Sequence, residues 1–184
     1  MSSAVLAMVG TGNAVDQGAG DGMSKNTDDE DDEGGAVGAG GEAPAPWPAL
    51  RFDQYIAHPP TAVWRALTDP DLVARWWAVG YVKPEVGHRF TLDMGNWGVQ
   101  PCEVTAVEPE RHLEYHFAQG VLDTTISWRL EPEGEGTRLR LEQAGFDLDS
   151  PMGRQAFAGM GNGWPHLLNL IERALDEAGA AAKG

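Results

Sequence analysis

The strongest constraint on the fold is a series of short segments between residues 89 and 143 in which apolar and polar side chains alternate. In residues 112–117, for example, the apolar residues are Leu113, Tyr115 and Phe117, and the residues that alternate with them are polar. Because successive side chains of a strand point to opposite faces, these segments predict an antiparallel meander with one buried and one solvated face. The predicted strands are Arg89–Asp93, Val99–Glu108, Arg111–Ala118, Thr124–Glu131 and Thr137–Gln143.

A further strand and two short helices are predicted before this meander. The strand, Leu50–Ala57, ends at a pair of prolines, which interrupt strand hydrogen bonding. Residues 60–67 carry the apolar stripe of a short amphipathic helix. A second helix is predicted to follow, with Asp69 as N-cap and Pro70 at its first position.

A long amphipathic helix is predicted after the meander, with Ser150 as N-cap and Pro151 at its first position. Three glycines at 159, 161 and 163, followed by Pro165, predict a kink or a break, with a second segment that restarts near Asn162. The apolar face of this helix is expected to contain Trp164, Leu167, Leu168, Leu170, Ile171 and Leu175.

The order of all these elements, with strands and helices in one chain, predicts an α+β domain.

The N-terminal segment differs sharply in composition from the rest of the chain. Residues 1–48 contain 10 of the 24 glycines, and nine acidic residues against one lysine give them −8 of the net charge of −15. Such a segment buries too little apolar surface to offset the entropy of ordering it. We therefore expect a disordered acidic tail and linker over 1–48, one folded domain over 49–179 and a frayed C-terminus over 180–184.

The charge and the hydropathy restrict the expected partners and location. A strongly acidic chain repels nucleic acid and anionic lipid, and no apolar run reaches the roughly 18 residues of a membrane span. The first ten residues lack the basic segment of a signal peptide, so a cytoplasmic location is expected. A protein partner of the acidic tail remains an alternative, and both a monomer and a homodimer remain open.

Three motifs carry a resemblance to a known superfamily: Ala57–Trp77, Val107–Leu113 and Asn162–Leu168. In these motifs and in the order of its elements, the chain resembles the SRPBCC (START/birch-pollen-allergen-like) superfamily. It is most similar to the branch named for the activator of the ninety-kilodalton heat-shock-protein ATPase. The resemblance implies a helix-grip fold, in which a curved antiparallel β-sheet wraps around a long C-terminal helix, with two short helices between the first and second strands. Members of the superfamily include ligand carriers, co-chaperone domains and cyclases, so the fold alone does not fix a function.

The resemblance also implies a cavity between the sheet and the helix, and the expected function is non-enzymatic binding of a small hydrophobic or amphipathic ligand there. A cavity of this kind is mostly apolar, with a few polar groups that orient the ligand. Trp97, between Gly95 and Gly98, is predicted to lie in a hairpin loop at the cavity mouth and to act as a lid. The candidate ligand-binding residues are Trp76, Trp77, Phe90, Trp97, Tyr115, Phe117, Trp128, Phe157, Trp164 and His166.

Two other functions remain as alternatives. A cyclase or hydrolase would need a buried titratable group in the cavity, such as His166, Glu114 or Asp93. A chaperone-activator or stress-response role would act through protein contacts, but the eukaryotic activators carry a separate chaperone-binding domain where this chain has its acidic tail.

No catalytic residue, metal or cofactor is predicted. The sequence contains neither a nucleophile elbow nor a phosphate-binding loop after a strand. His112 and His116 lie about 13 Å apart along an extended strand, too far to share a metal. Cys102 stands in an apolar strand and is expected to be a buried hydrophobic residue rather than a nucleophile.

Overall fold

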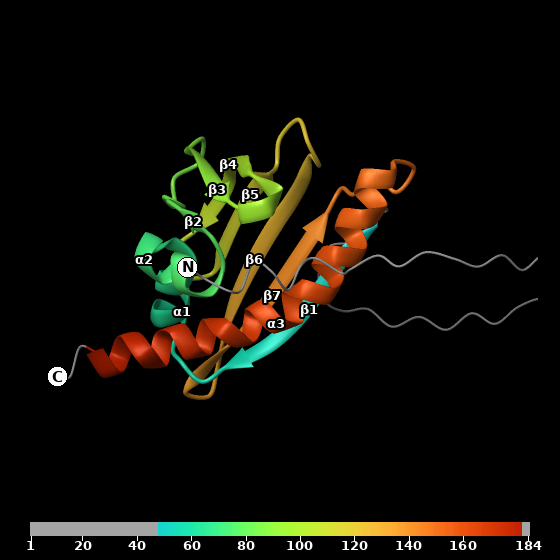
Figure 1. Cartoon of the computed structure of the whole chain (residues 1–184). Helices are drawn as coiled ribbons and strands as arrows, with labels where there is room; N and C mark the ends of the chain where they lie inside the picture. Colours follow the sequence, from blue (N-terminus) through green and yellow to red (C-terminus); the bar gives the residue numbers. More distant parts are fainter. Residues whose placement is uncertain (1–47, 182–184) are drawn as a thin grey trace, which may run out of the picture. The chain divides into compact units, whose positions relative to one another are not determined.

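The computed structural model describes residues 48–181 and has the α+β architecture that the sequence predicts: a curved antiparallel sheet with one long helix on its inner face (Figure 1). Apart from Pro48, the predicted acidic tail lies outside the described residues, as do residues 182–184. The strands are β1 (Ala49–Ile56), β2 (Val79–Gly80), β3 (Arg89–Asp93), β4 (Val99–Glu108), β5 (His112–Phe117), β6 (Thr124–Glu133) and β7 (Gly136–Ala144). The helices are α1 (Pro60–Thr68), α2 (Pro70–Trp76), the short 3-10 turn η2 (Gly95–Trp97) and α3 (Pro151–Ala181).

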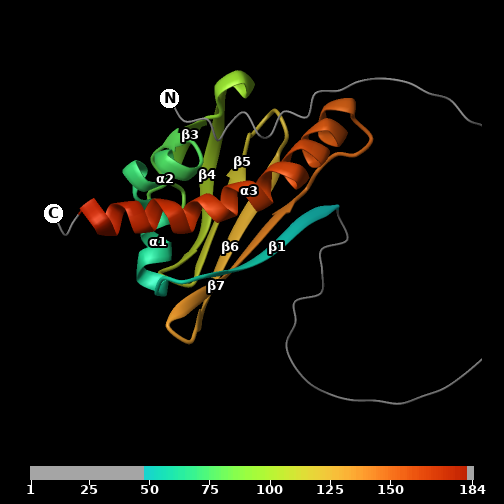
Figure 2. The ribbon, with the colours of Figure 1, turned by 60° about the horizontal axis from the view of Figure 1, so that its bottom comes forward.

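The seven strands form one sheet in the order β1-β7-β6-β5-β4-β3-β2, and every neighbouring pair is antiparallel. An irregularity between Val104 and Ala106 shifts the register of β4 against β5, and such bulges bend a strand and increase its twist. Figure 2 shows the strands curving behind α3, which crosses their inner face. This is the predicted helix-grip fold.

The alternation in the sequence correctly assigns the two faces of the sheet. Leu113, Tyr115 and Phe117 of β5 are all buried against the helix side. The opposite face carries exposed ion pairs, in which Asp53 of β1 contacts Arg138 and Arg140 of β7 at 3.0 and 3.1 Å. Exposed pairs of this kind add little stability, so the free energy of packing comes from the inner face.

The two short helices form as the sequence predicts. Asp69 accepts hydrogen bonds from the backbone amides of Asp71 and Leu72, and Pro70 occupies the first turn of α2. The indole of Trp76 is buried and donates a hydrogen bond of 2.8 Å to the carbonyl of Ala66 in α1. α2 is thereby tied to α1, and it also lies against α3 (Figure 2).

The C-terminal helix departs from the sequence prediction in one respect: it bends but does not break. α3 is a single element from Pro151 to Ala181 with Pro165 inside it, and no second segment restarts near Asn162. The proline ring would clash with the carbonyl four residues earlier, and that residue is Gly161, which has no side chain to add to the crowding. Burial of Trp164, Leu167 and their neighbours holds the helix together on both sides of the proline. Figure 1 shows the change of direction along α3.

One strand, the two-residue β2, has no signal in the sequence. Val79 and Gly80 pair with Asp93 and Leu92 and extend the sheet beyond β3. A Cβ added to Gly80 would lie 2.5 Å from the carbonyl oxygen of Thr91, so the close approach of these two backbones requires glycine. None of the helices within residues 48–181 has the length and apolar character needed to cross a bilayer.

The centre of the core is a cluster of four tryptophans from three regions of the fold. Trp77 lies 5.2 Å from Trp164 of α3 between ring centroids, and Trp164 lies 5.6 Å from Trp128 of β6 in an edge-to-face arrangement. Trp76 contacts both Trp77 and Trp128. Edge-to-face and tilted pairs at these distances are favourable aromatic geometries, so the cluster joins α2, α3 and the sheet.

A buried hydrogen-bond chain fixes α3 on the sheet. The indole of Trp164 donates to Oε1 of Gln143 in β7 at 2.8 Å, and Nε2 of Gln143 donates to Oγ1 of Thr124 in β6 at 3.1 Å. Gln143 and Thr124 are both fully buried. Because a buried polar group left without a partner is costly, this chain selects one position of the helix.

We predict that Gln143→Leu lowers the free energy of unfolding by roughly 1–3 kcal/mol, because it leaves the buried Trp164 N–H without an acceptor. Trp164→Phe removes the same hydrogen bond from the other side, so the double variant should be less destabilised than the sum of the two single variants. Urea denaturation followed by circular dichroism measures all three. Effects that add within about 0.3 kcal/mol would show that this bond does not couple the helix to the sheet.

Candidate functional site

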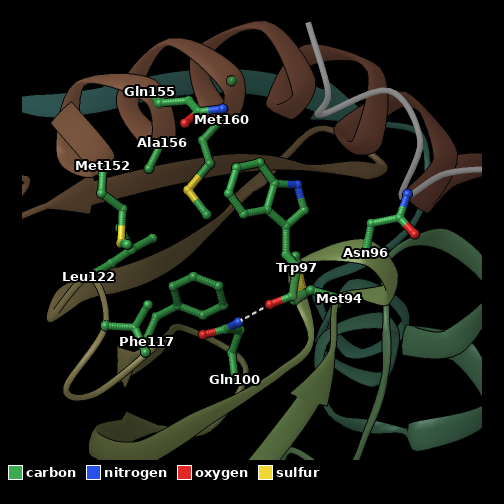
Figure 3. Close-up of a pocket in the computed structure, with 12 residues that line it drawn as sticks. Met94, Asn96, Trp97, Gln100, Phe117, Leu122, Met152, Gln155, Ala156 and Met160 are labelled. Carbon is green, nitrogen blue, oxygen red and sulfur yellow. Dashed lines mark hydrogen bonds between the residues drawn. The ribbon is translucent and has the colours of Figure 1, made fainter. Parts of the chain in front are cut away.

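A pocket lies between the N-terminal half of α3, the turn that joins β3 to β4, and the loop that joins β5 to β6. Its volume is about 260 Å³. Figure 3 shows side chains from all three regions facing this space, with α3 on one side and β4 and β5 on the other. The lining residues are Met94, Asn96, Trp97, Gln100, Phe117, Val121, Leu122, Met152, Gln155, Ala156, Gly159 and Met160.

The chemistry of the lining is apolar and uncharged. The lining includes three methionines and two aromatic residues, and its polar side chains are the amides of Asn96, Gln100 and Gln155. Methionine side chains are flexible and polarisable, so they adapt to the shape of an apolar guest. None of the lining side chains carries a formal charge, so the pocket offers no partner to an ionised ligand.

The α3 wall of the pocket follows from helix geometry. Met152, Ala156 and Met160 are spaced by four residues, so they share one face of the helix. The start of the helix is fixed because the Ser150 hydroxyl accepts a hydrogen bond of 2.9 Å from the backbone amide of Gly153. A Cβ at Gly153 would clash with the carbonyl of Asp147, so this first turn packs directly against the preceding loop.

The opposite wall depends on the turn between β3 and β4, which the sequence places at Gly95–Gly98. The backbone amide of Met94 donates to the carbonyl of Gly98 at 2.9 Å, and Gly98 has a φ of 75°, a conformation that favours glycine. Trp97 stands on this turn, is 41% exposed and points toward α3 (Figure 3).

Gln100 connects this turn to the inner face of the sheet. Its Nε2 donates to the backbone carbonyl of Trp97, while its Oε1 is buried and has no hydrogen-bond partner among residues 48–181. The NH₂ end of this amide must face the Trp97 carbonyl, because a carbonyl oxygen can only accept a hydrogen bond. The Oε1 end therefore faces away from it.

Two of the ten predicted ligand-binding residues, Trp97 and Phe117, line this pocket. Trp76, Trp77, Trp128 and Trp164 form the packed cluster described above. Tyr115 is buried next to it, and its hydroxyl accepts a hydrogen bond of 3.0 Å from Trp128.

The other three predicted residues also lie outside the lining. Phe90 packs edge-on against Tyr115 at 5.4 Å between ring centroids. Phe157 packs against Phe146 at 5.2 Å. His166 lies on the exposed side of α3. The predicted set therefore divides into two pocket residues and eight at other positions.

Sequence reasoning missed most of the pocket lining. Met152, Ala156 and Met160 extend the apolar stripe of α3 toward its N-terminus, a signal that is present in the sequence but weaker than the leucine-rich stripe after Trp164. Met94 and Gln100 follow the strand alternation, which indicates that they face inward but not that a space lies beside them.

Titratable groups near the inner face are held in their neutral forms. Burial raises the pKa of the Tyr115 hydroxyl and raises the pKa of the Cys102 thiol to about 11. Asp93 is exposed, and Glu114 lies on the outer face of β5. Within residues 48–181, no group of three or more His, Cys, Asp or Glu side chains is placed to hold a metal ion.

We predict that Cys102 is inert in the folded protein. A thiol with a pKa of about 11 stays protonated at pH 8, whereas the unfolded thiol has a pKa of about 8.5, and the thiolate is the reactive form. Labelling by dithionitrobenzoate at pH 8 should be at least about a hundredfold slower in buffer than in 8 M urea. Equal rates in the two solvents would contradict the burial of this side chain.

Comparison with known proteins places the fold in a family. Residues 57–176 match the family described as "Activator of Hsp90 ATPase homolog 1-like protein". Protein MLL2253 from Mesorhizobium loti is 38% identical, with a TM-score of 0.63 over 71% of this chain and 98% of that one. CalU16 from Micromonospora echinospora is 26% identical, with a TM-score of 0.58 over 69% and 75% of the two chains.

More distant similarity supports the fold alone. Protein BH1534 from Bacillus halodurans is 23% identical, with a TM-score of 0.61 over 70% of this chain and 96% of that one. No curated protein matches the chain. The family match covers well over half of the sequence and includes α1, α2, the meander and most of α3, so the chain belongs to the Activator of Hsp90 ATPase homolog 1-like family.

Proposed function

We propose that this domain binds a small, uncharged and largely apolar ligand in the pocket between α3 and the β3–β4 turn. The observation that carries the proposal is the lining: it is apolar and uncharged, with side-chain amides as its polar groups. Burial of an apolar ligand against such a surface is favourable, whereas an ion would lose its hydration without gaining a partner. The family to which the chain belongs consists of ligand-binding domains, some of which are polyketide cyclases.

The size of the pocket limits the ligand. A volume of about 260 Å³ lies just below the range of about 300–1,000 Å³ typical of ligand pockets. A molecule with one or two rings, or a short aliphatic chain, suits this volume.

Binding without catalysis is the form of the proposal that the lining supports. Acid–base catalysis needs a group that exchanges a proton near the operating pH within hydrogen-bond reach of the substrate. The twelve lining residues include no Asp, Glu, His, Lys, Cys or Tyr. A chaperone-activator role through the acidic tail concerns residues outside those that the structure describes.

We predict that Ala156→Leu blocks the pocket, because Ala156 is buried on its α3 wall. Wild-type protein should bind 2-methoxynaphthalene in isothermal titration calorimetry, and the variant should bind it more than about tenfold more weakly. Ala158→Leu, on the exposed side of the same helix, is the matched control and should bind as the wild type does.

The stability of the same variant gives an independent test of the pocket. Overpacking a filled core costs about 1–3 kcal/mol, whereas leucine at position 156 has free space to enter, so the melting temperature should not fall. A large loss of stability in Ala156→Leu, or no binding by the wild type of either the probe or its hydroxyl analogue 2-naphthol, would contradict the proposal.

We predict that Trp97 covers the bound ligand. Trp97→Ala should weaken binding of 2-methoxynaphthalene roughly fivefold or more, since it removes a large part of the apolar wall. The free energy of unfolding in urea should change by less than about 1 kcal/mol, because the side chain is partly exposed. Trp97→Phe keeps an aromatic ring and should retain most of the affinity. If Trp97→Ala left binding unchanged, the covering role would be wrong.

A further inference from the structure

The polar wall of the pocket contains one buried atom that the chain does not satisfy. Gln100 is about nine-tenths buried, with 9% of its surface exposed. Its Nε2 donates to the carbonyl of Trp97, and its Oε1 has no hydrogen-bond partner among the described residues. In Figure 3 this oxygen is turned away from Trp97 and toward Phe117, which also lines the pocket.

The other buried polar residues of the described chain have partners for their side chains. Gln143 is bonded to Trp164 and to Thr124, and Thr137 donates to the carbonyl of His58 at 2.7 Å. The indole N–H of Trp77 is also unpaired within residues 48–181, but Trp77 belongs to the tryptophan cluster and not to the lining. Gln100 is therefore the residue that combines an unpaired buried polar atom with a place on the pocket wall.

An unpaired buried acceptor has a direct consequence for binding. Leaving an amide oxygen without a donor costs free energy in the ligand-free protein, and a ligand that supplies a donor recovers it. The lining offers no charge that would compensate an ammonium group, so the donor that fits is neutral. The terminal torsion of glutamine is soft, so the amide can present Oε1 to a guest with a small rotation.

We propose that the pocket recognises an uncharged apolar ligand that carries a hydroxyl group, and that Oε1 of Gln100 accepts the hydrogen bond which this hydroxyl donates. The inference rests on the proposed function and adds the polar feature by which the pocket discriminates among apolar molecules. Phe117 and the methionines contact the hydrocarbon part, and Gln100 fixes the orientation of the ligand.

A matched pair of probes tests the inference on the wild-type protein. 2-Naphthol and 2-methoxynaphthalene share the same ring system, and only the first has an O–H donor. A purely apolar pocket prefers the ether, because the hydroxyl loses its hydrogen bonds to water. With Gln100 as acceptor, 2-naphthol should bind about five- to tenfold more tightly in isothermal titration calorimetry.

Variants assign this preference to one residue. Gln100→Leu removes the acceptor and should reverse the preference, so that the ether binds at least as tightly as the naphthol. Gln119→Leu makes the same change at a half-buried amide outside the lining, and it should keep the naphthol preference.

The outcomes separate the two proposals. If both probes bind with equal affinity, or if Gln100→Leu keeps the naphthol preference, the role of Gln100 is wrong while the pocket remains a ligand site. A water molecule that already satisfies the oxygen would give this result. If neither probe binds, the proposed function falls and the inference with it. Should Gln100→Leu fail to fold, Gln100→Met, which also removes the acceptor and keeps an unbranched side chain, makes the same test.

Discussion

The hydrogen bond between the indole of Trp164 and the amide of Gln143 is the contact on which the arrangement of the domain depends. It joins the middle of α3 to the inner face of β7 at 2.8 Å, in surroundings that exclude water. A helix held to a sheet only by apolar contacts can slide, because burial of apolar area is not directional. A buried hydrogen bond has one geometry, and its loss is costly. This bond sets the position of α3 in the core, next to its N-terminal half, and the exposed contacts of Gln54 with Asn169 and of His58 with Asp176 add to it farther along the helix.

The same anchor explains why the pocket lies where it does. On one side of Trp164, the space between helix and sheet is filled by Trp76, Trp77 and Trp128, whose rings are in contact with one another and with Trp164. On the other side, α3 presents Ala156 and Gly159, which are too small to reach the sheet, and two flexible methionines. α3 contains Pro165 and changes direction along its length as it crosses the curved sheet (Figure 1). The space on one side of Trp164 is therefore filled by aromatic rings, and the space on the other side holds the pocket.

Much of the fold was predictable from local patterns, because each pattern reports a local physical requirement. Alternation assigned Leu113, Tyr115 and Phe117 to the inner face, and Asp69 with Pro70 marked the start of α2. The pocket was harder to predict, because alternation distinguishes inside from outside but does not tell whether the inner space is filled. Trp128 and Trp97 look equally suited to a cavity wall in the sequence, yet the first is core and the second lines the pocket. Whether an inward side chain meets packed core or open space depends on the distance between α3 and the sheet. That distance is set by the hydrogen bond between Trp164 and Gln143, which lie 21 positions apart in the sequence.

The two inward-facing glutamines show how the structure distinguishes a structural polar group from a recognition group. Gln143 and Gln100 lie on the same face of the same sheet, and both are buried. Gln143 has an acceptor and a donor within the chain, so its amide is complete before any ligand arrives. Gln100 has only its donor end satisfied by residues 48–181. The donor end of Gln100 holds the β3–β4 turn, and its acceptor end, at the wall of an apolar pocket, is left for a partner from outside the chain.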